Sequence, residues 1–185
     1  GELGWELHHP MDKMETLYDA IMEAGEEFGI ANFGTYAMNS LRMEKAYKGW
    51  GSELTTEITP MEAGLERFVD FSKCFLGREA TLSRKLLGVN TKLVYVSVET
   101  ADSDCLGNEP VLDPESTATG GKIIGMTTSG AYGHTVGRSL AFAYVQPKYA
   151  IPGTKFEIRV LGHNCSATVL KEAAYDPQNL RLRDV

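Results

Sequence analysis

Cysteine is scarce in this sequence, and the residues that do occur are far apart: Cys74, Cys105 and Cys165. The chain has no CxxC pair and no cysteine–histidine spacing of the kind that binds zinc. An odd number of separated cysteines is typical of proteins whose thiols stay free in a reducing compartment. The sequence therefore predicts free thiols, no disulfide framework and no metal site.

Long hydrophobic runs and clusters of basic residues are also missing. No apolar run approaches the roughly 20 residues that a helix needs to cross a bilayer. The formal net charge is −7 and the 18 Lys and Arg residues are scattered, which argues against nucleic acids and membranes as partners. The chain opens with GELGWELHH, without an initiator Met or the basic and apolar regions of a signal peptide. We therefore expect it to be a piece of a longer protein.

The composition that is present fits a globular protein and changes character near Gly88. Hydrophobic residues make up 43% and charged residues 23% of the 185 positions, values close to globular averages. Helical patterns dominate before Gly88, and short alternating segments rich in Val, Ile and Thr follow it. The sequence predicts an α+β fold, with an α+β region over residues 1–88 and a small all-β domain over residues 89–185.

The first region combines one predicted strand with several predicted helices. Glu2–Leu7 alternates, with Leu3, Trp5 and Leu7 on one face and Glu2 and Glu6 on the other. Four helices are predicted. The first runs over about 12–28 with Asp12 as its cap, and the second over 36–47 with Thr35 as its cap. The third begins at a capping box formed by Thr59–Glu62, and the fourth runs over 77–87.

The second region has five predicted strands and no helix between them. Glycine, proline, asparagine and aspartate clusters separate the strands. This arrangement favours an antiparallel barrel or sandwich. The strands are expected at Lys92–Glu99, Lys122–Thr127, Ser139–Gln146, Lys155–Leu161 and Ser166–Lys171.

Local patterns supply one candidate binding group, the carboxylates of Glu2 and Glu6. A carboxylate held on a strand can accept two parallel hydrogen bonds from a planar ligand that offers adjacent N–H groups. The alternative is that both are solvated surface side chains. His8 and His9 would face opposite sides of a strand, so they are expected to be surface histidines and not a metal pair.

Four segments carry a resemblance to a known family when they are taken in order: GELGWEL, NSLRMEKAYKGWGSELTTEITPMEAGL, FLGREA and GKIIGMTTSGAYGHTVGRSLAFAYV. The series resembles the second half of the glycine-cleavage T-protein (aminomethyltransferase-like) fold and runs over residues 1–171. The variants RMEKA and WGSE look most like the dimethylglycine and sarcosine dehydrogenase branch. The resemblance implies three subdomains around a tetrahydrofolate site. This chain would supply the end of the central one and the final antiparallel β-barrel.

The same resemblance implies a function and a set of partners. In that branch a separate N-terminal domain with covalent FAD oxidises an N-methyl amine, and the folate domain turns the one-carbon unit into 5,10-methylenetetrahydrofolate. The expected cofactor of this chain is tetrahydrofolate, bound weakly or not at all by the isolated chain, with FAD only in the missing flavin domain. The isolated chain is expected to be inactive and to self-associate through apolar surface. The compartment would be the cytoplasm in a bacterium and the mitochondrial matrix in a eukaryote.

Carried over position by position, the resemblance assigns Glu6 to the folate pteridine and leaves Glu2 as support or surface. Met38 replaces a folate-binding arginine of T-proteins, so that contact is absent. Arg42 and Glu44 match the family and are expected to form an internal ion pair. Arg67 stands where T-proteins have an aromatic residue, and it either pairs with the glutamate tail of the folate or is simply exposed. The catalytic aspartate would lie upstream, so no catalytic residue is expected in this chain.

Two other functions stay open at this level. The same fold resembles the regulatory subunit of pyruvate dehydrogenase phosphatase, where it serves interaction and not catalysis. A glycine-cleavage-type aminomethyltransferase would keep the folate and change the one-carbon donor.

Overall fold

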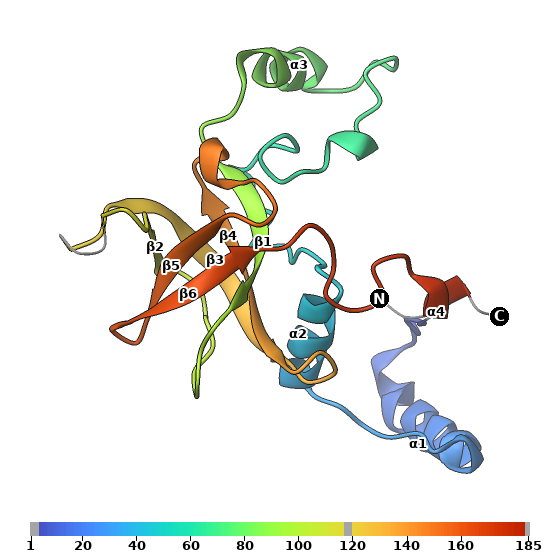
Figure 1. Cartoon of the computed structure of the whole chain (residues 1–185). Coiled ribbons are helices and arrows are strands. Elements are labelled where there is room, and N and C mark those ends of the chain that lie inside the picture. The colour runs from blue at the N-terminus through green and yellow to red at the C-terminus, as the bar shows by residue number, and fades with distance from the viewer. Residues whose placement is uncertain (1–3, 117–119, 184–185) are drawn as a thin grey trace.

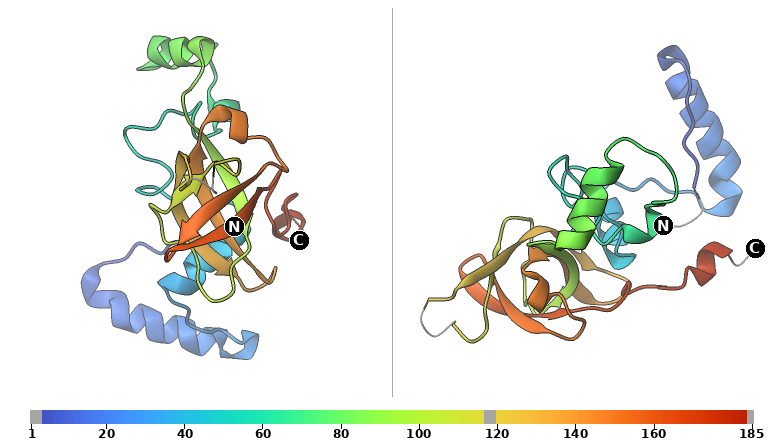
Figure 2. Two further views of the ribbon diagram at one scale, coloured as in Figure 1. Left: turned by 60° about the vertical axis from the view of Figure 1, so that its left-hand side comes forward. Right: turned by 90° about the horizontal axis from the view of Figure 1, so that it is seen from above.

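The computed structural model describes residues 4–116 and 120–183. A six-stranded barrel forms its centre, and helices α1 and α3 lie at opposite ends of the molecule with the barrel between them (Figures 1 and 2). The strands are β1 (Lys92–Val98), β2 (Pro110–Leu112), β3 (Ile123–Gly133), β4 (Arg138–Val145), β5 (Lys155–Val160) and β6 (His163–Val169).

All pairings in the barrel are antiparallel, and the order β1-β4-β3-β2-β5-β6 closes because β1 also pairs with β6. Closure leaves no exposed sheet edge, which is how small all-β domains avoid edge-to-edge aggregation. The five predicted strands all exist, and the expected small antiparallel barrel is confirmed. The sequence pattern missed β2, which is only three residues long, and it ended β3 six residues early.

The barrel interior is built from alternate residues of the strands. Strand β5 shows the pattern clearly, since Phe156, Ile158 and Val160 are buried and their neighbours are not. Strand β4 differs because it is buried on both faces over Ser139–Ala143. Its second face packs against a separate apolar cluster outside the barrel. That cluster consists of Met43, Tyr95, Leu140 and Phe142.

Helix α2 (Thr35–Glu44) supplies Met43 to that outer cluster and covers strands β3 and β4. The predicted helix over 36–47 is therefore present, although it begins at Thr35 and ends three residues earlier. Gly34, not Thr35, is its N-cap residue, and no side chain caps it.

Helix α1 (Met14–Gly25) stands clear of the barrel and buries none of its residues (Figures 1 and 2). Single 3-10 turns flank it, η1 (Met11–Lys13) and η2 (Glu26–Phe28), and Gly29 ends the segment with a left-handed φ of 71°. The helix predicted over 12–28 is present, but Asp12 makes no cap hydrogen bond. Helix α3 (Arg78–Leu87) ends at Gly88, where φ is 83°, as predicted.

Two predictions for the first region are wrong. Residues 4–10 form no strand, and Glu2 lies outside the described residues. The capping box at Thr59–Glu62 forms, since the Thr59 backbone N–H donates to Glu62 Oε2 at 3.0 Å. No helix follows it, because Gly64 takes a left-handed φ of 66° and the chain turns away. Only the short 3-10 turn η3 (Glu66–Phe68) follows.

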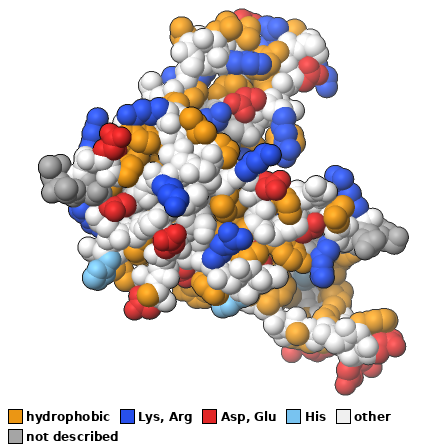
Figure 3. Space-filling view, viewed as in Figure 1, with side chains coloured by type: hydrophobic (Ala, Val, Ile, Leu, Met, Phe, Trp, Pro, Cys, Tyr) orange, Lys and Arg blue, Asp and Glu red, His pale blue; other side chains and the backbone are white. Residues whose placement is uncertain are grey.

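The remaining elements are the 3-10 turn η5 (Pro147–Tyr149) and the short helix α4 (Leu180–Arg183). The division into domains at Gly88 stays a prediction. All three cysteines are free, and burial raises the pKa of the Cys105 thiol to about 12. Over the described residues no helix has the length and apolar character needed to cross a membrane. On the face shown in Figure 3, Lys and Arg side chains are dispersed, and acidic side chains gather at the end of α1.

Candidate functional site

Helix α2 is fixed to strand β3 by two side-chain hydrogen bonds. Ser40 Oγ donates to the Tyr132 carbonyl at 2.6 Å, and Asn39 Nδ2 donates to the Gly130 carbonyl at 3.2 Å. Because both acceptors are backbone atoms of β3, the helix is held in register with the barrel. The other side chains of α2 are thereby held in fixed positions relative to β3.

Glu53 is a fully buried carboxylate whose two oxygens both accept hydrogen bonds. Its Oε2 accepts from Arg42 Nη1 at 3.0 Å and from the Gly49 N–H at 2.7 Å. Its Oε1 accepts from Thr128 Oγ1 at 2.6 Å and from Ser129 Oγ at 2.5 Å. A buried charge is tolerated when it is paired and hydrogen-bonded in this way. Glu53 therefore joins α2, the loop after it and the β-bulge of β3.

The C-terminal end of α2 is joined to two further parts of the chain. The Glu44 side chain is almost fully buried, and its Oε1 accepts from the backbone N–H groups of Thr135 at 2.6 Å and Val136 at 3.2 Å in the β3–β4 turn. Lys45 Nζ donates to the Asp176 carbonyl at 2.7 Å and lies 3.3 Å from its carboxylate. These contacts draw the segment after β6 against the helix.

The predicted ion pair between Arg42 and Glu44 is wrong, because Arg42 has another partner. Arg42 pairs with Glu53, whereas Glu44 binds the β3–β4 turn. Residues two apart on a helix point in different directions, so their side chains do not meet. Arg42 is still an internal ion-pair residue, since its guanidinium also holds Asn39 Oδ1 through Nε at 2.8 Å.

A cavity of about 590 Å³ lies beside this face of α2. The N-terminal segment, the loop before α2, α2 itself, the β3–β4 turn and the segment after β6 all contribute to its wall. Its size falls in the range that holds a small organic ligand. Among the residues that line it are Trp5, Phe33, Met38, Arg42, Lys45 and Tyr175.

The chemistry of the cavity wall suits a planar ligand with polar edges. Trp5, Phe33 and Tyr175 offer flat apolar surfaces, which favour stacking against a ring. Arg42 Nη2 donates no hydrogen bond within residues 4–116 and 120–183, so this donor is available on a lining residue. Lys45 adds positive charge that is partly balanced by Asp176.

Glu6, the residue assigned to the pteridine, lies next to a lining residue but is not one itself. Its neighbour Trp5 lines the cavity, while the Glu6 side chain is 92% exposed. His8 Nε2 lies 3.9 Å from Glu6 Oε2. Since residues 4–10 form no strand, the rigid support expected for Glu6 is missing in this conformation. Its role in binding stays a prediction.

The structure does not bring Arg67 into the same cavity. Arg67 is exposed, belongs to η3, and places its guanidinium 4.6 Å from the ring centre of Phe68. Met38, at the position where the family has an arginine, does line the cavity. The two alternatives for Arg67 therefore stay open.

Sequence reasoning included Glu53 only as the last residue of the WGSE variant and gave it no role in a site. The residue follows Trp50-Gly51-Ser52, which indicated only the end of a helix, and a carboxylate after a glycine turn looks like a surface residue. Its hydroxyl partners are 75 and 76 residues further along the chain. Within the described part of the chain, no cluster of three or more His, Cys, Asp or Glu side chains is arranged to hold a metal ion.

Comparison with known proteins assigns the chain to a family. The family profile described as "GCVT N-terminal domain" matches residues 1–73, and the one described as "Glycine cleavage T-protein C-terminal barrel domain" matches residues 92–176. The chain belongs to the glycine cleavage T-protein family. The α+β fold predicted from the resemblance, ending in a small antiparallel barrel, is thereby confirmed.

Within the T-protein family, the chain is similar to the dimethylglycine and sarcosine dehydrogenases. It is 44% identical over 187 residues to "Dimethylglycine dehydrogenase, mitochondrial" of Mus musculus, covering 99% of this chain and 21% of that protein. It is 30% identical over 194 residues to "Sarcosine dehydrogenase, mitochondrial" of the same organism, covering 100% of this chain and 20% of that protein. The chain thus spans about a fifth of the length of these relatives.

A solved T-protein structure shares the fold. The structure of glycine cleavage system aminomethyltransferase T from Bartonella henselae superimposes with a TM-score of 0.80 at 23% identity. The superposition covers 91% of this chain and 45% of that chain. At this identity the match supports the fold alone.

Proposed function

We propose that this chain forms part of the tetrahydrofolate site of a flavin-dependent N-methylglycine dehydrogenase. The 44% identity to a dimethylglycine dehydrogenase over 99% of the chain and the two T-protein domain matches support this proposal. In the proposed role, the one-carbon unit released from the N-methyl amine is accepted here, and FAD belongs to another part of the same enzyme. The compartment would be the mitochondrial matrix in a eukaryote and the cytoplasm in a bacterium.

The observation that carries the proposal is the cavity beside α2, with its aromatic walls and its available arginine donor. Tetrahydrofolate supplies the nucleophilic nitrogen that takes the one-carbon unit. The residues of this chain would hold the planar ring between Trp5, Phe33 and Tyr175 and keep water away from it. Holding two reactants in position in this way can contribute several kcal/mol to lowering a barrier.

The buried Glu53 network has a supporting part in this proposal. It fixes the Arg42 guanidinium through Nη1, and Nη2 has no acceptor among the residues that the structure describes. A guanidinium held by a buried carboxylate loses little further side-chain entropy when a ligand binds. Arg42 would therefore donate to a carbonyl or carboxylate oxygen of the folate.

Titration calorimetry with tetrahydrofolate under reducing conditions tests the proposal on this chain. The isolated chain is expected to bind tetrahydrofolate weakly or not at all, so the same titration is made on the full-length parent enzyme. There we expect saturable binding, and we expect Glu6→Ala to weaken it by about 1–3 kcal/mol, because two donors on the ligand would lose their acceptor. Glu15→Ala, which removes an exposed carboxylate from α1, is the matched control and should leave binding unchanged. Equal affinities of the unmutated chain and Glu6→Ala would remove Glu6 from the site. A lack of saturable binding by the isolated chain is compatible with either an incomplete pocket or a non-folate module, and the titration of the full-length parent separates the two. A lack of binding by the parent would contradict the folate proposal and favour a non-catalytic module.

We also propose that the chain self-associates through the apolar side chains around α1 and α2. Phe28, Phe33 and Tyr36 are 81%, 71% and 94% exposed, which is unusual for neighbouring large aromatic residues. Sedimentation velocity should show a weight-average mass that rises above 20.3 kDa as concentration increases. The double variant Phe33→Ser, Tyr36→Ser should move the distribution toward the monomer. A single monomeric species at all concentrations would contradict this expectation.

A further inference from the structure

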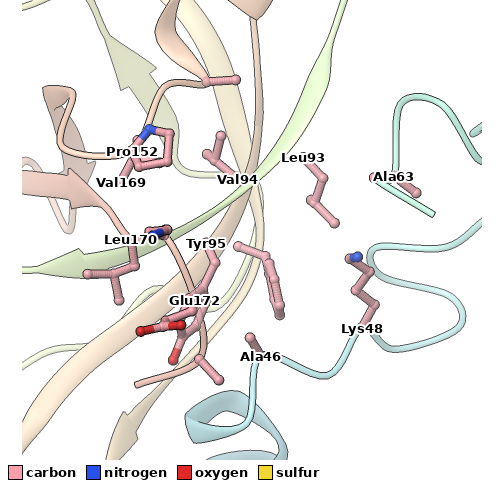
Figure 4. Close-up of a pocket in the computed structure, with 15 residues that line it drawn as sticks. Ala46, Lys48, Ala63, Leu93, Val94, Tyr95, Pro152, Val169, Leu170 and Glu172 are labelled. Carbon is pink, nitrogen blue, oxygen red and sulfur yellow. The ribbon is translucent and has the colours of Figure 1, made fainter. Parts of the chain in front are cut away.

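A second pocket, of about 280 Å³, lies beside strand β1 and has other lining residues than the cavity beside α2 (Figure 4). Its walls come from the loops after α2, strand β1, the segment after η5 and the segment after β6. Most of them are apolar, with Leu93, Val94, Phe142, Pro152 and Leu170 among the lining residues. None of these residues lines the first cavity.

Lys48 lines this pocket together with two other charged residues, Lys171 and Glu172. Figure 4 shows the Lys48 side chain entering from the loop after α2, with the amine turned toward Leu93 and Ala63 in that view. The amine has no hydrogen bond and no ion pair within 4 Å anywhere in residues 4–116 and 120–183. A partly buried ammonium group without a partner is unfavourable, because the loss of water is not replaced by another interaction.

The charges around Lys48 increase this imbalance. Burial lowers the pKa of the Lys48 amine, and the positive charge of Arg67 lowers it further; Glu66 and Glu53 oppose the change from a distance at which they form no ion pair. Arg67 also has no carboxylate partner within the described residues. Two neighbouring cations that lack a counter-ion favour the binding of an anion.

The same pocket contains a second unsatisfied polar group. Tyr95 lines it and is 7% exposed, and its hydroxyl donates to no acceptor within the described residues, although the nearby Ala174 backbone N–H opposes part of the rise in its pKa. Burial raises the pKa of Tyr95 to about 12, so the hydroxyl stays protonated and able to donate. Buried polar groups without partners are rare in folded proteins, and one way to satisfy them is through a ligand. Glu172 also lines the pocket and lies on the other side from Lys48 in Figure 4, and its neighbour Lys171, of opposite charge, is a lining residue as well.

We propose that this pocket binds a small carboxylate with an apolar body, with the carboxylate on Lys48 and the body against Leu93, Phe142 and Leu170. A carboxylate that accepts from an ammonium donor in partly apolar surroundings makes a strong, charge-assisted hydrogen bond. The volume limits the ligand to a size near that of a substituted benzoate, since it lies at the lower end of ligand pockets.

Benzoate is the probe, and an NMR titration of the ¹⁵N-labelled chain is the measurement. We expect saturable shifts of the backbone amides of Ala63, Leu93 and Leu170, and at least tenfold weaker binding of benzamide, which has the same shape without the charge. Lys48→Met should weaken benzoate binding at least tenfold. Lys155→Met, at an exposed lysine of β5, is the matched control and should not change it.

A second measurement tests the proposal without a variant, in case Lys48→Met folds poorly. Labelling the lysines of the unmutated chain with ¹³C-methyl groups lets the Lys48 signal itself be followed, and benzoate should shift it before the signals of other lysines. Shifts that do not saturate or that spread over many lysines, equal binding of benzamide, or full binding by folded Lys48→Met would each overturn the proposal. Because the tetrahydrofolate experiment concerns another cavity, either proposal can fail alone.

One further arm identifies the source of the carboxylate. Tetrahydrofolate that displaces benzoate would show that the tail carboxylates of a folate occupy the Lys48 pocket, with Arg67 beside it. Simultaneous binding of both would show that the pocket serves a separate small carboxylate. Both results support a carboxylate site.

Discussion

Glu53→Ala is expected to lower the free energy of unfolding by about 3–5 kcal/mol, the cost of removing one partner from a buried ion pair. The change leaves the Arg42 guanidinium without its counter-ion and takes the acceptor from Thr128 Oγ1 and Ser129 Oγ. For a chain of 185 residues, each kcal/mol corresponds to roughly 2–4 °C in the melting temperature. Circular dichroism with thermal and urea unfolding should therefore show a fall of about 6–20 °C.

Three further variants separate the charge from the packing. Glu53→Gln keeps the shape and should cost less than Glu53→Ala. The double variant Arg42→Met, Glu53→Met removes both charges and should recover much of the loss, since apolar replacement of a whole buried pair is often close to neutral. Glu57→Ala, at an exposed position four residues later, is the control and should change stability by less than about 0.5 kcal/mol. A loss below 1 kcal/mol for Glu53→Ala would show that the network contributes little to stability.

The barrel could be predicted from the sequence because its information is local. Alternating Val, Ile and Thr residues between glycine and proline turns identify a half-buried strand without knowledge of its partner. The same rule failed at Glu2–Leu7, where the alternation is equally clear but residues 4–10 pair with no other strand. A strand needs a neighbour to satisfy its backbone groups, and alternation alone does not show whether one exists.

The candidate site was harder to predict because its contacts join distant parts of the chain. The resemblance assigned Glu6 and Arg67 by position, and it gave no role to Glu53, whose hydroxyl partners lie on β3. It also gave no indication of Lys48, because what marks Lys48 is the lack of a partner in three dimensions. Residue type and spacing record which groups are present, whereas burial and pairing decide which of them carry unbalanced charge.

Gly130→Ala is the second substitution from which we expect a large effect, about 1–3 kcal/mol or more of lost stability. A Cβ atom at Gly130 would lie 2.5 Å from the Cys105 carbonyl oxygen and 2.8 Å from the Cys105 Cβ. Backbone atoms cannot move aside as a flexible side chain can, so the added methyl group must displace a strand or the Cys105 segment. Gly130 also adjoins Ser129 and accepts from Asn39, so a displaced strand would disturb both the Glu53 network and the docking of α2.

The matched control is Gly34→Ala, because a Cβ atom there meets nothing within 4 Å and Gly34 also lacks a left-handed φ. Gly34 is the N-cap residue of α2, where glycine is clearly preferred to alanine, so this change should cost up to about 1 kcal/mol. Urea unfolding of the two variants side by side therefore isolates the steric contact from the general effect of replacing glycine. If Gly130→Ala unfolds at the same urea concentration as Gly34→Ala, the Cys105 segment yields easily and the barrel does not hold β3 rigidly. If Gly130→Ala loses tetrahydrofolate binding while Gly34→Ala keeps it, the position of β3 matters to the cavity beside α2. The reason is that α2 lines this cavity and is held in place by its hydrogen bonds to β3.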